Sequence, residues 1–128
     1  MTGYHNALLD FWAQFGVPCF LSGNVPEDQP FPYITLDIVK PAALSTTVMT
    51  AYSWHRLGGA TTQPMTERAA LLDAIAAAIP ESDAIIRFDG GYAILRRNPA
   101  DFQSYTADPD DKSVIGGRTS YEVTYYGM

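Results

Sequence analysis

The residue types that most often do chemistry are sparse in this chain. Its 128 residues include two histidines, His5 and His55, and one cysteine, Cys19. A nucleophilic triad needs a serine or cysteine beside a histidine with an acid behind it, and no G-x-S-x-G elbow is present. We interpret both histidines as surface residues and Cys19 as a small hydrophobe in the apolar run 17–21. The sequence therefore predicts no catalytic residue and no cofactor.

Acidic residues and glycine pairs give weak signals for ion binding. Asp108 and Asp110 have the spacing of the first ligands in a calcium loop, and Asp111 follows them. The twelfth position of that loop is Thr119, where glutamate is expected, and Pro109 with Asp110 suits a plain turn. The glycine pairs at 58–59, 90–91 and 116–117 lack phosphate-loop spacing and are interpreted as turns. No metal site is predicted.

Arginines and aromatic residues indicate contact surfaces instead. Arg87, Arg96 and Arg97 form a basic cluster. We consider three interpretations: a solvated face whose arginines pair with Asp89 or Asp101, a protein interface, or a nucleic-acid contact. Several aromatic residues lie on expected strands, where cross-strand packing or a neighbouring subunit would explain them. The candidate oligomer and partner contacts are Tyr52, Trp54, Arg96, Arg97, Tyr105, Asp108, Asp110, Asp111, Arg118 and Tyr126.

The elements that must position these residues follow from hydrophobic periodicity. Helices are predicted at 4–15, stopped by Gly16, and at 64–79, where Thr62 or Thr66 can cap the start. The second helix has Glu67 in its first turn, and its apolar face is Met65, Ala69, Leu72, Ala76 and Ile79, with Leu71 and Ile75 beside it. Strands are predicted at 19–21, 33–40, 47–54, 84–88, 92–97, 102–106 and 118–126, and loops at 22–32, 55–63 and the rest of 98–117.

This order of elements defines the fold class. Helices and hairpins are segregated along the chain rather than alternating as βαβ units, a pattern typical of α+β domains. We expect one domain over residues 1–128, with an antiparallel or mixed β-sheet and two helices packed on one face.

Composition narrows the function classes. Charged residues make up only 17% of the chain, against about 25% in ordinary domains, so we expect part of the surface to be covered by a partner. The net charge of -6 argues against a free-standing nucleic-acid binder. No apolar run has the length of a membrane helix, and residues 1–5 lack the basic start of a signal peptide. These features predict a protein made in a reducing cytoplasm, with no membrane partner.

Four motifs, in order and spanning most of the chain, resemble a known family. They are V-P-x-x at 17–20, P-x-P-Y-I-x-L at 30–36, E-x-x-x-L-x-D-A-I at 67–75 and R-x-S-Y-E-V-x-Y at 118–125. Together with an opening amphipathic helix, they resemble the tail-terminator and tail-completion proteins of long-tailed, siphophage-type phages.

The resemblance implies a structural virion protein without an active site. Such a protein would form a homo-oligomeric ring, typically a hexamer, that caps the tail tube and joins it to the head connector. DNA would pass through the lumen as cargo, and the location would be the tail neck after assembly in the host cytoplasm. The alternatives are a head-completion or neck protein of the same virion and, in another class, a small α+β ligand-binding module or enzyme.

Overall fold

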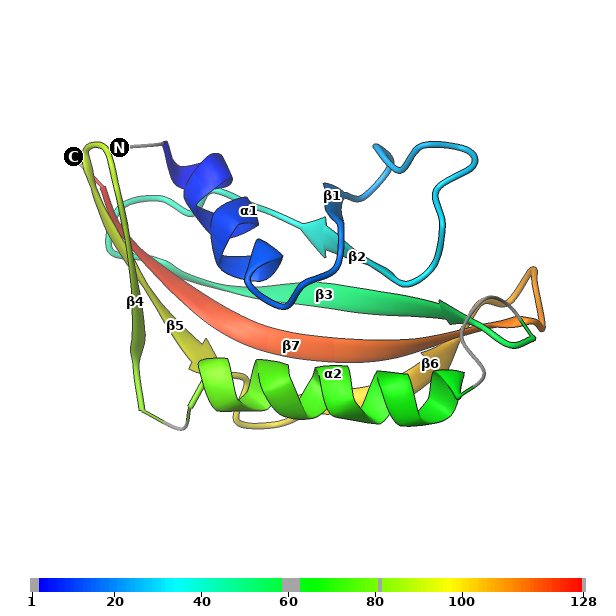
Figure 1. The fold of residues 1–128 in the computed structure, drawn as a ribbon. Helices are drawn as coiled ribbons and strands as arrows, with labels where there is room; N and C mark the ends of the chain where they lie inside the picture. The colour runs from blue at the N-terminus through cyan, green and yellow to red at the C-terminus, as the bar shows by residue number, and fades with distance from the viewer. Residues whose placement is uncertain (1–2, 59–62, 81, 128) are drawn as a thin grey trace.

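The computed structural model describes residues 3–58, 63–80 and 82–127. Figure 1 shows the path of the chain from the first helix to the last strand. The elements, in order, are α1 (Tyr4–Ala13), β1 (Cys19–Leu21), β2 (Tyr33–Asp37), β3 (Thr46–Arg56), α2 (Pro64–Ala78), β4 (Ala84–Phe88), β5 (Gly91–Arg97), β6 (Gln103–Ala107) and β7 (Val114–Gly127). All nine elements were expected from the sequence, and the differences lie in their ends.

The strands form one seven-stranded sheet in the order β1-β2-β3-β7-β5-β4, with β6 also paired to β7. Only β1 and β2 are parallel; every other pair is antiparallel. The 14 residues of β7 pair with β3 along one side and with β5 and then β6 along the other. The expected α+β class with a mixed sheet is confirmed.

Side chains alternate strictly between the two faces of the β3–β7 ladder. On β3 the odd-numbered residues Met49, Ala51, Ser53 and His55 are buried, whereas the even-numbered residues are half-buried or exposed. Because Met49 lies opposite Tyr121 in the register, the odd-numbered residues of both strands share one face. We call this the inner face, and we call the opposite face of the sheet the outer face.

Both helices pack on the inner face. The ring of Trp12 in α1 lies 5.4 Å from that of Tyr121, and Leu72 in α2 lies against Gly117. Tyr121 and Gly117 are four residues apart on one strand, so they point the same way. One cluster of buried side chains therefore joins α1, α2 and the sheet, and the expectation of two helices on one face is confirmed. In the part of the chain that is described, neither helix is long and apolar enough to cross a membrane.

The buried face of α2 differs from the expected one. Leu71, Leu72, Ile75 and Ile79 are buried, but Met65 is 60% exposed. Polar side chains in the first turn of α2 point toward the sheet instead, as described below. Gln63 occupies the N-cap position without a side-chain hydrogen bond, so capping by Thr66 is wrong, and Thr62 lies outside the described residues.

Three strand ends were placed wrongly, one of them because β2 stops at Asp37 rather than at residue 40. β3 continues through His55 and Arg56, and β7 begins at Val114, so Gly116 and Gly117 lie within a strand rather than closing a loop. Their neighbours explain the glycines: an added Cβ would come within 2.9 Å of the Ser53 carbonyl oxygen at Gly116 and within 2.8 Å of Ser53 Oγ at Gly117. Glycine serves close packing here, not a turn.

Candidate functional site

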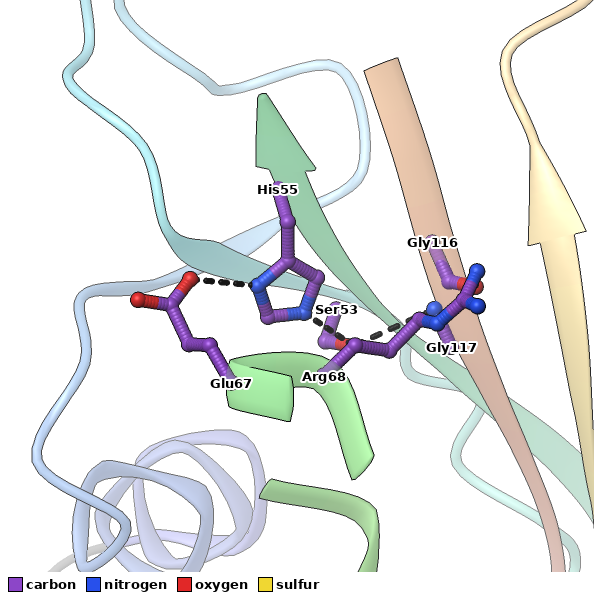
Figure 2. A network of polar contacts seen from close by, with 6 residues as sticks. All are labelled: Ser53, His55, Glu67, Arg68, Gly116 and Gly117. Carbon is purple, nitrogen blue, oxygen red and sulfur yellow. Dashed lines mark hydrogen bonds and ion pairs between the residues drawn. The ribbon is translucent and has the colours of Figure 1, made fainter. Parts of the chain in front are cut away.

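A polar network under the inner face joins β3, α2 and β7 (Figure 2). The side chain of His55 is fully buried, with Nδ1 2.7 Å from Glu67 Oε1 and Nε2 3.0 Å from Ser53 Oγ. The Gly117 amide donates a hydrogen bond of 3.2 Å to the same Ser53 oxygen. The prediction that His55 is a surface residue is therefore wrong, whereas His5 is exposed as expected.

Local sequence explains how these groups meet. Ser53 and His55 are two residues apart on a strand, so both side chains point to the inner face. Glu67 lies in the first turn of α2, and its carboxylate points toward the His55 ring (Figure 2). Since Ser53 already accepts the Gly117 amide, we assign its hydroxyl proton to His55 Nε2 and the ring proton to Nδ1, which donates to the carboxylate. Each polar group of the network then has a hydrogen-bond partner.

Serine, histidine and glutamate in this order have the connectivity of a catalytic triad. A nucleophile, however, must be open to its substrate. Ser53 is only 3% exposed, and Leu72 and Gly117 lie against it. In this conformation the network therefore ties the start of α2 to β3 and β7, and no substrate can reach the hydroxyl.

The next residue of α2 adds a second polar contact with the sheet. Arg68 Nη1 donates to the Gly116 carbonyl oxygen at 3.3 Å, and its guanidinium carbon lies 3.8 Å from the centre of the Tyr105 ring. Its Nε is buried without a hydrogen-bond partner, and no carboxylate of a described residue forms an ion pair with this arginine. Arg68 therefore places a cation at the seam between α2 and β6.

A groove of about 350 Å³ runs beside that cation. Residues of α2 and β6 line it, namely Ala69, Leu72, Asp73, Gln103, Ser104 and Tyr105. Gln103 bridges the two elements, because its side-chain amide donates to the Leu72 carbonyl oxygen at 2.9 Å. Tyr105, one of the expected contact residues, is 61% exposed at this groove.

The expected basic cluster is divided between the two faces of β5. Arg97 donates to the carbonyl oxygens of Ile79 and Ala76, at 2.7 and 2.8 Å, and so satisfies the C-terminal end of α2. Arg96 pairs with Asp83 on the surface, and this pairing lowers the pKa of the Asp83 carboxyl. Arg118, another expected contact, forms an ion pair of 2.8 Å with Asp101.

The expected acidic contacts form a turn before β7. The Asp108 carboxylate accepts the Asp110 amide at 2.9 Å, and that of Asp111 accepts both the amide and the hydroxyl of Ser113. These hydrogen bonds lower the pKa of Asp111. In the described ranges no group of three or more histidine, cysteine or acidic side chains is arranged to hold a metal ion. The turn interpretation of this segment is confirmed.

The outer face carries the remaining expected contacts as two aromatic pairs. Tyr52 stacks on Trp54 with ring centres 5.6 Å apart, and Trp54 donates its indole proton to Thr35 Oγ1. Tyr126 stacks on Tyr92 at 4.8 Å. Ordinary cross-strand packing thus explains part of the aromatic content.

Apolar side chains between these pairs are open to solvent. Val48 and Ile85 are 53% and 55% exposed, and Tyr92 is 37% exposed. The register places Ile85 opposite Ile94, and Ile94 opposite Thr124, so these residues share the outer face. Since both helices lie on the inner face, no described helix covers this surface.

Comparison with known proteins gives a fold likeness alone. No family model and no curated protein matches the chain. A solved structure whose given name states no function matches it with a TM-score of 0.51 and 14% sequence identity, covering 97% of this chain and 92% of its own. The α+β arrangement therefore recurs in a second protein with very different side chains.

Proposed function

We propose that the chain is a structural virion protein, the tail terminator of a long-tailed phage, which caps the tail tube as a homo-oligomeric ring and joins it to the head connector. The observation that carries this proposal is the uncovered outer face. One side of a seven-stranded sheet carries exposed Val48, Ile85 and Tyr92, and no described helix packs over it. Exposed apolar side chains that gather on one face of a small domain are typical of a contact site.

Charge supports a subunit rather than an isolated domain. Only 17% of the residues are charged, and the outer face places Glu122 between Val48 of β3 and Arg96 of β5. An apolar patch with ionic groups of both signs suits a specific protein interface, because the charges select the register of the partner.

The net charge of -6 suits the passage of DNA. Phosphates bind where lysine and arginine gather, and each such contact must be broken before the duplex can move. A ring built from acidic subunits repels the duplex that slides through it. The partners under this proposal are further copies of the chain, the tail-tube protein and the connector.

Mass in solution tests the assembly. Sedimentation velocity across a range of concentrations should show wild type as a multiple of the monomer, with a hexamer as the end point. The double variant Val48→Asp with Ile85→Asp should stay monomeric, because it places carboxylates in the apolar patch. Met65→Asp is the matched control, since Met65 is 60% exposed on α2 and away from the patch. A monomeric wild type at every concentration, or full assembly of the double variant, would contradict the proposal.

Tail tubes test the specific role. Added to tubes growing from the tail-tube protein of the same genome, the ring should bind one end and stop elongation, as seen by electron microscopy. A ring that binds the head connector but leaves tube growth unchanged would identify a neck protein instead.

A further inference from the structure

The groove between α2 and β6 offers three features to a binding segment. It has an open volume of about 350 Å³, the Arg68 cation at one side, and the free edge of β6. Two hydrogen bonds flank β6: the Ser120 amide donates to the Phe102 carbonyl oxygen, and the Asp108 amide donates to the Val114 carbonyl oxygen. Because main-chain groups alternate along a strand, the even-numbered residues of β6 hydrogen-bond to β7. The main-chain groups of Gln103, Tyr105 and Ala107 therefore point away from β7, and in the described chain only β7 pairs with β6.

A complementary feature lies on the loop between β1 and β2. The Gln29 amide donates to the Pro26 carbonyl oxygen at 3.1 Å, which closes a turn with Glu27 and Asp28 at its tip. Both acids are exposed, and neither forms an ion pair with a described residue. Figure 1 shows this loop projecting away from β3 on the same side as α1.

The tip and the groove lie on opposite sides of the central strands. The loop joins β1 to β2 on one side of β3, whereas β6 lies on the far side of β7. A tip that fills the groove must then belong to another molecule. A contact between two different surfaces of one chain is heterologous, and repeated contacts of that kind close into a ring when the rotation allows.

We propose that the acidic turn at 26–29 of one copy docks in the groove between α2 and β6 of the next copy, with its carboxylates at Arg68. This inference rests on the proposed homo-oligomer and names a contact within it. The carboxylates would pair with a cation that already stacks on Tyr105, and the turn could hydrogen-bond to the free edge of β6. Asp73 also lines the groove and repels acids, which places the tip at the Arg68 end.

A disulfide between copies tests the geometry. In a Cys19→Ala background, Asp28→Cys combined with Ala69→Cys, at the Arg68 end of the groove, should give a reducible ladder of dimers, trimers and larger species under mild oxidation. Either cysteine alone should give no species beyond dimers. The matched control is Asp10→Cys combined with Ala69→Cys, because Asp10 is exposed on α1, and this pair should give no ladder.

Charge reversal supplies a second measurement that needs no new cysteine. Glu27→Lys with Asp28→Lys should raise the concentration needed for assembly at least tenfold, Arg68→Glu should partly restore it, and Asp10→Lys should leave it unchanged. An oligomer that forms normally with reversed tip charges and gives no ladder would overturn this docking and leave the proposed function standing. A chain that never forms an oligomer would overturn both.

Discussion

Along β3 and β7 the odd-numbered side chains lie beneath two helices, whereas the even-numbered side chains lie on a face that no described helix covers. The inner face holds Trp12 against Tyr121 and buries His55 among hydrogen-bond partners. The outer face holds stacked aromatic pairs and exposed Val48 and Ile85. Residues one position apart thus meet different demands: inner residues must fit a closed space, whereas outer residues range from buried Ser120 and Thr124 to exposed Val48 and Ile85.

The largest effect on stability should come from truncating a buried side chain on the inner face. Trp12 is fully buried, so Trp12→Ala removes its packing and leaves a cavity. We expect the free energy of unfolding to fall by about 3–5 kcal/mol, measured by urea denaturation. A loss below about 1 kcal/mol would show that the inner face tolerates such a cavity, against the usual cost of a truncated core aromatic.

A smaller effect separates two neighbouring arginines. Arg97→Met removes the donors that satisfy Ile79 and Ala76 at the end of α2, and it should cost about 1.5–3 kcal/mol in urea denaturation. Arg96→Met breaks only an exposed ion pair and should leave stability unchanged within error. Equal losses of stability for the two variants would show that the inner-face and outer-face arginines of β5 contribute alike.

Breaking a stacked pair on the outer face should matter less. Tyr92→Ser removes the ring that lies on Tyr126 and should cost about 0.5–1.5 kcal/mol, with Tyr92→Phe as a control that keeps the stack. A cost as large as that of Trp12→Ala would mean that the outer face is held as firmly as the core.

The smallest effect concerns pH at the turn before β7. Hydrogen bonds from Ser113 lower the folded-state pKa of Asp111, so their stabilisation is present above the unfolded value and is lost as pH falls through the folded pKa. Ser113→Ala should raise the Asp111 pKa toward that of a free aspartate, read from the carboxyl carbon in an NMR titration. An unchanged pKa would assign the shift to the groups that this variant keeps, namely the backbone amide of residue 113 and Arg56, which lies 3.6 Å from the carboxylate.

Periodicity was enough to predict the elements of the fold. Alternation predicted a strand at 33–40 and helical spacing predicted a helix at 4–15, and both elements are present but end earlier, at Asp37 and Ala13. The hairpin of strands predicted at 84–88 and 92–97 is also present. The predicted ends of β3 and β7 were wrong because glycine and histidine are typical of loops. Here Gly116 and Gly117 make room for Ser53, and buried His55 finds its partner Glu67 on a helix that begins nine residues further along the chain.

The candidate contacts were harder to predict than the fold. Arg96 and Arg97 are adjacent in the sequence and were predicted to form one cluster, but neighbouring residues of a strand point to opposite faces. The Arg97 side chain donates hydrogen bonds to carbonyl oxygens at the end of α2. The stacking of Arg68 on Tyr105 beside the groove was not predicted, because the two residues are far apart in the sequence and no motif connects them. Applying the two-residue period through His55 would have placed that histidine beside Ser53 on the inner face.

The position of β7 has a consequence for the protein during synthesis. Among the described residues it follows every other strand in the sequence, yet it pairs with β3, β5 and β6. While the ribosome is still making residues 114–127, these three strands lack their central partner, and their edges are open to other nascent chains. The sheet can therefore close only after β7 has left the exit tunnel, so folding must follow translation of this strand.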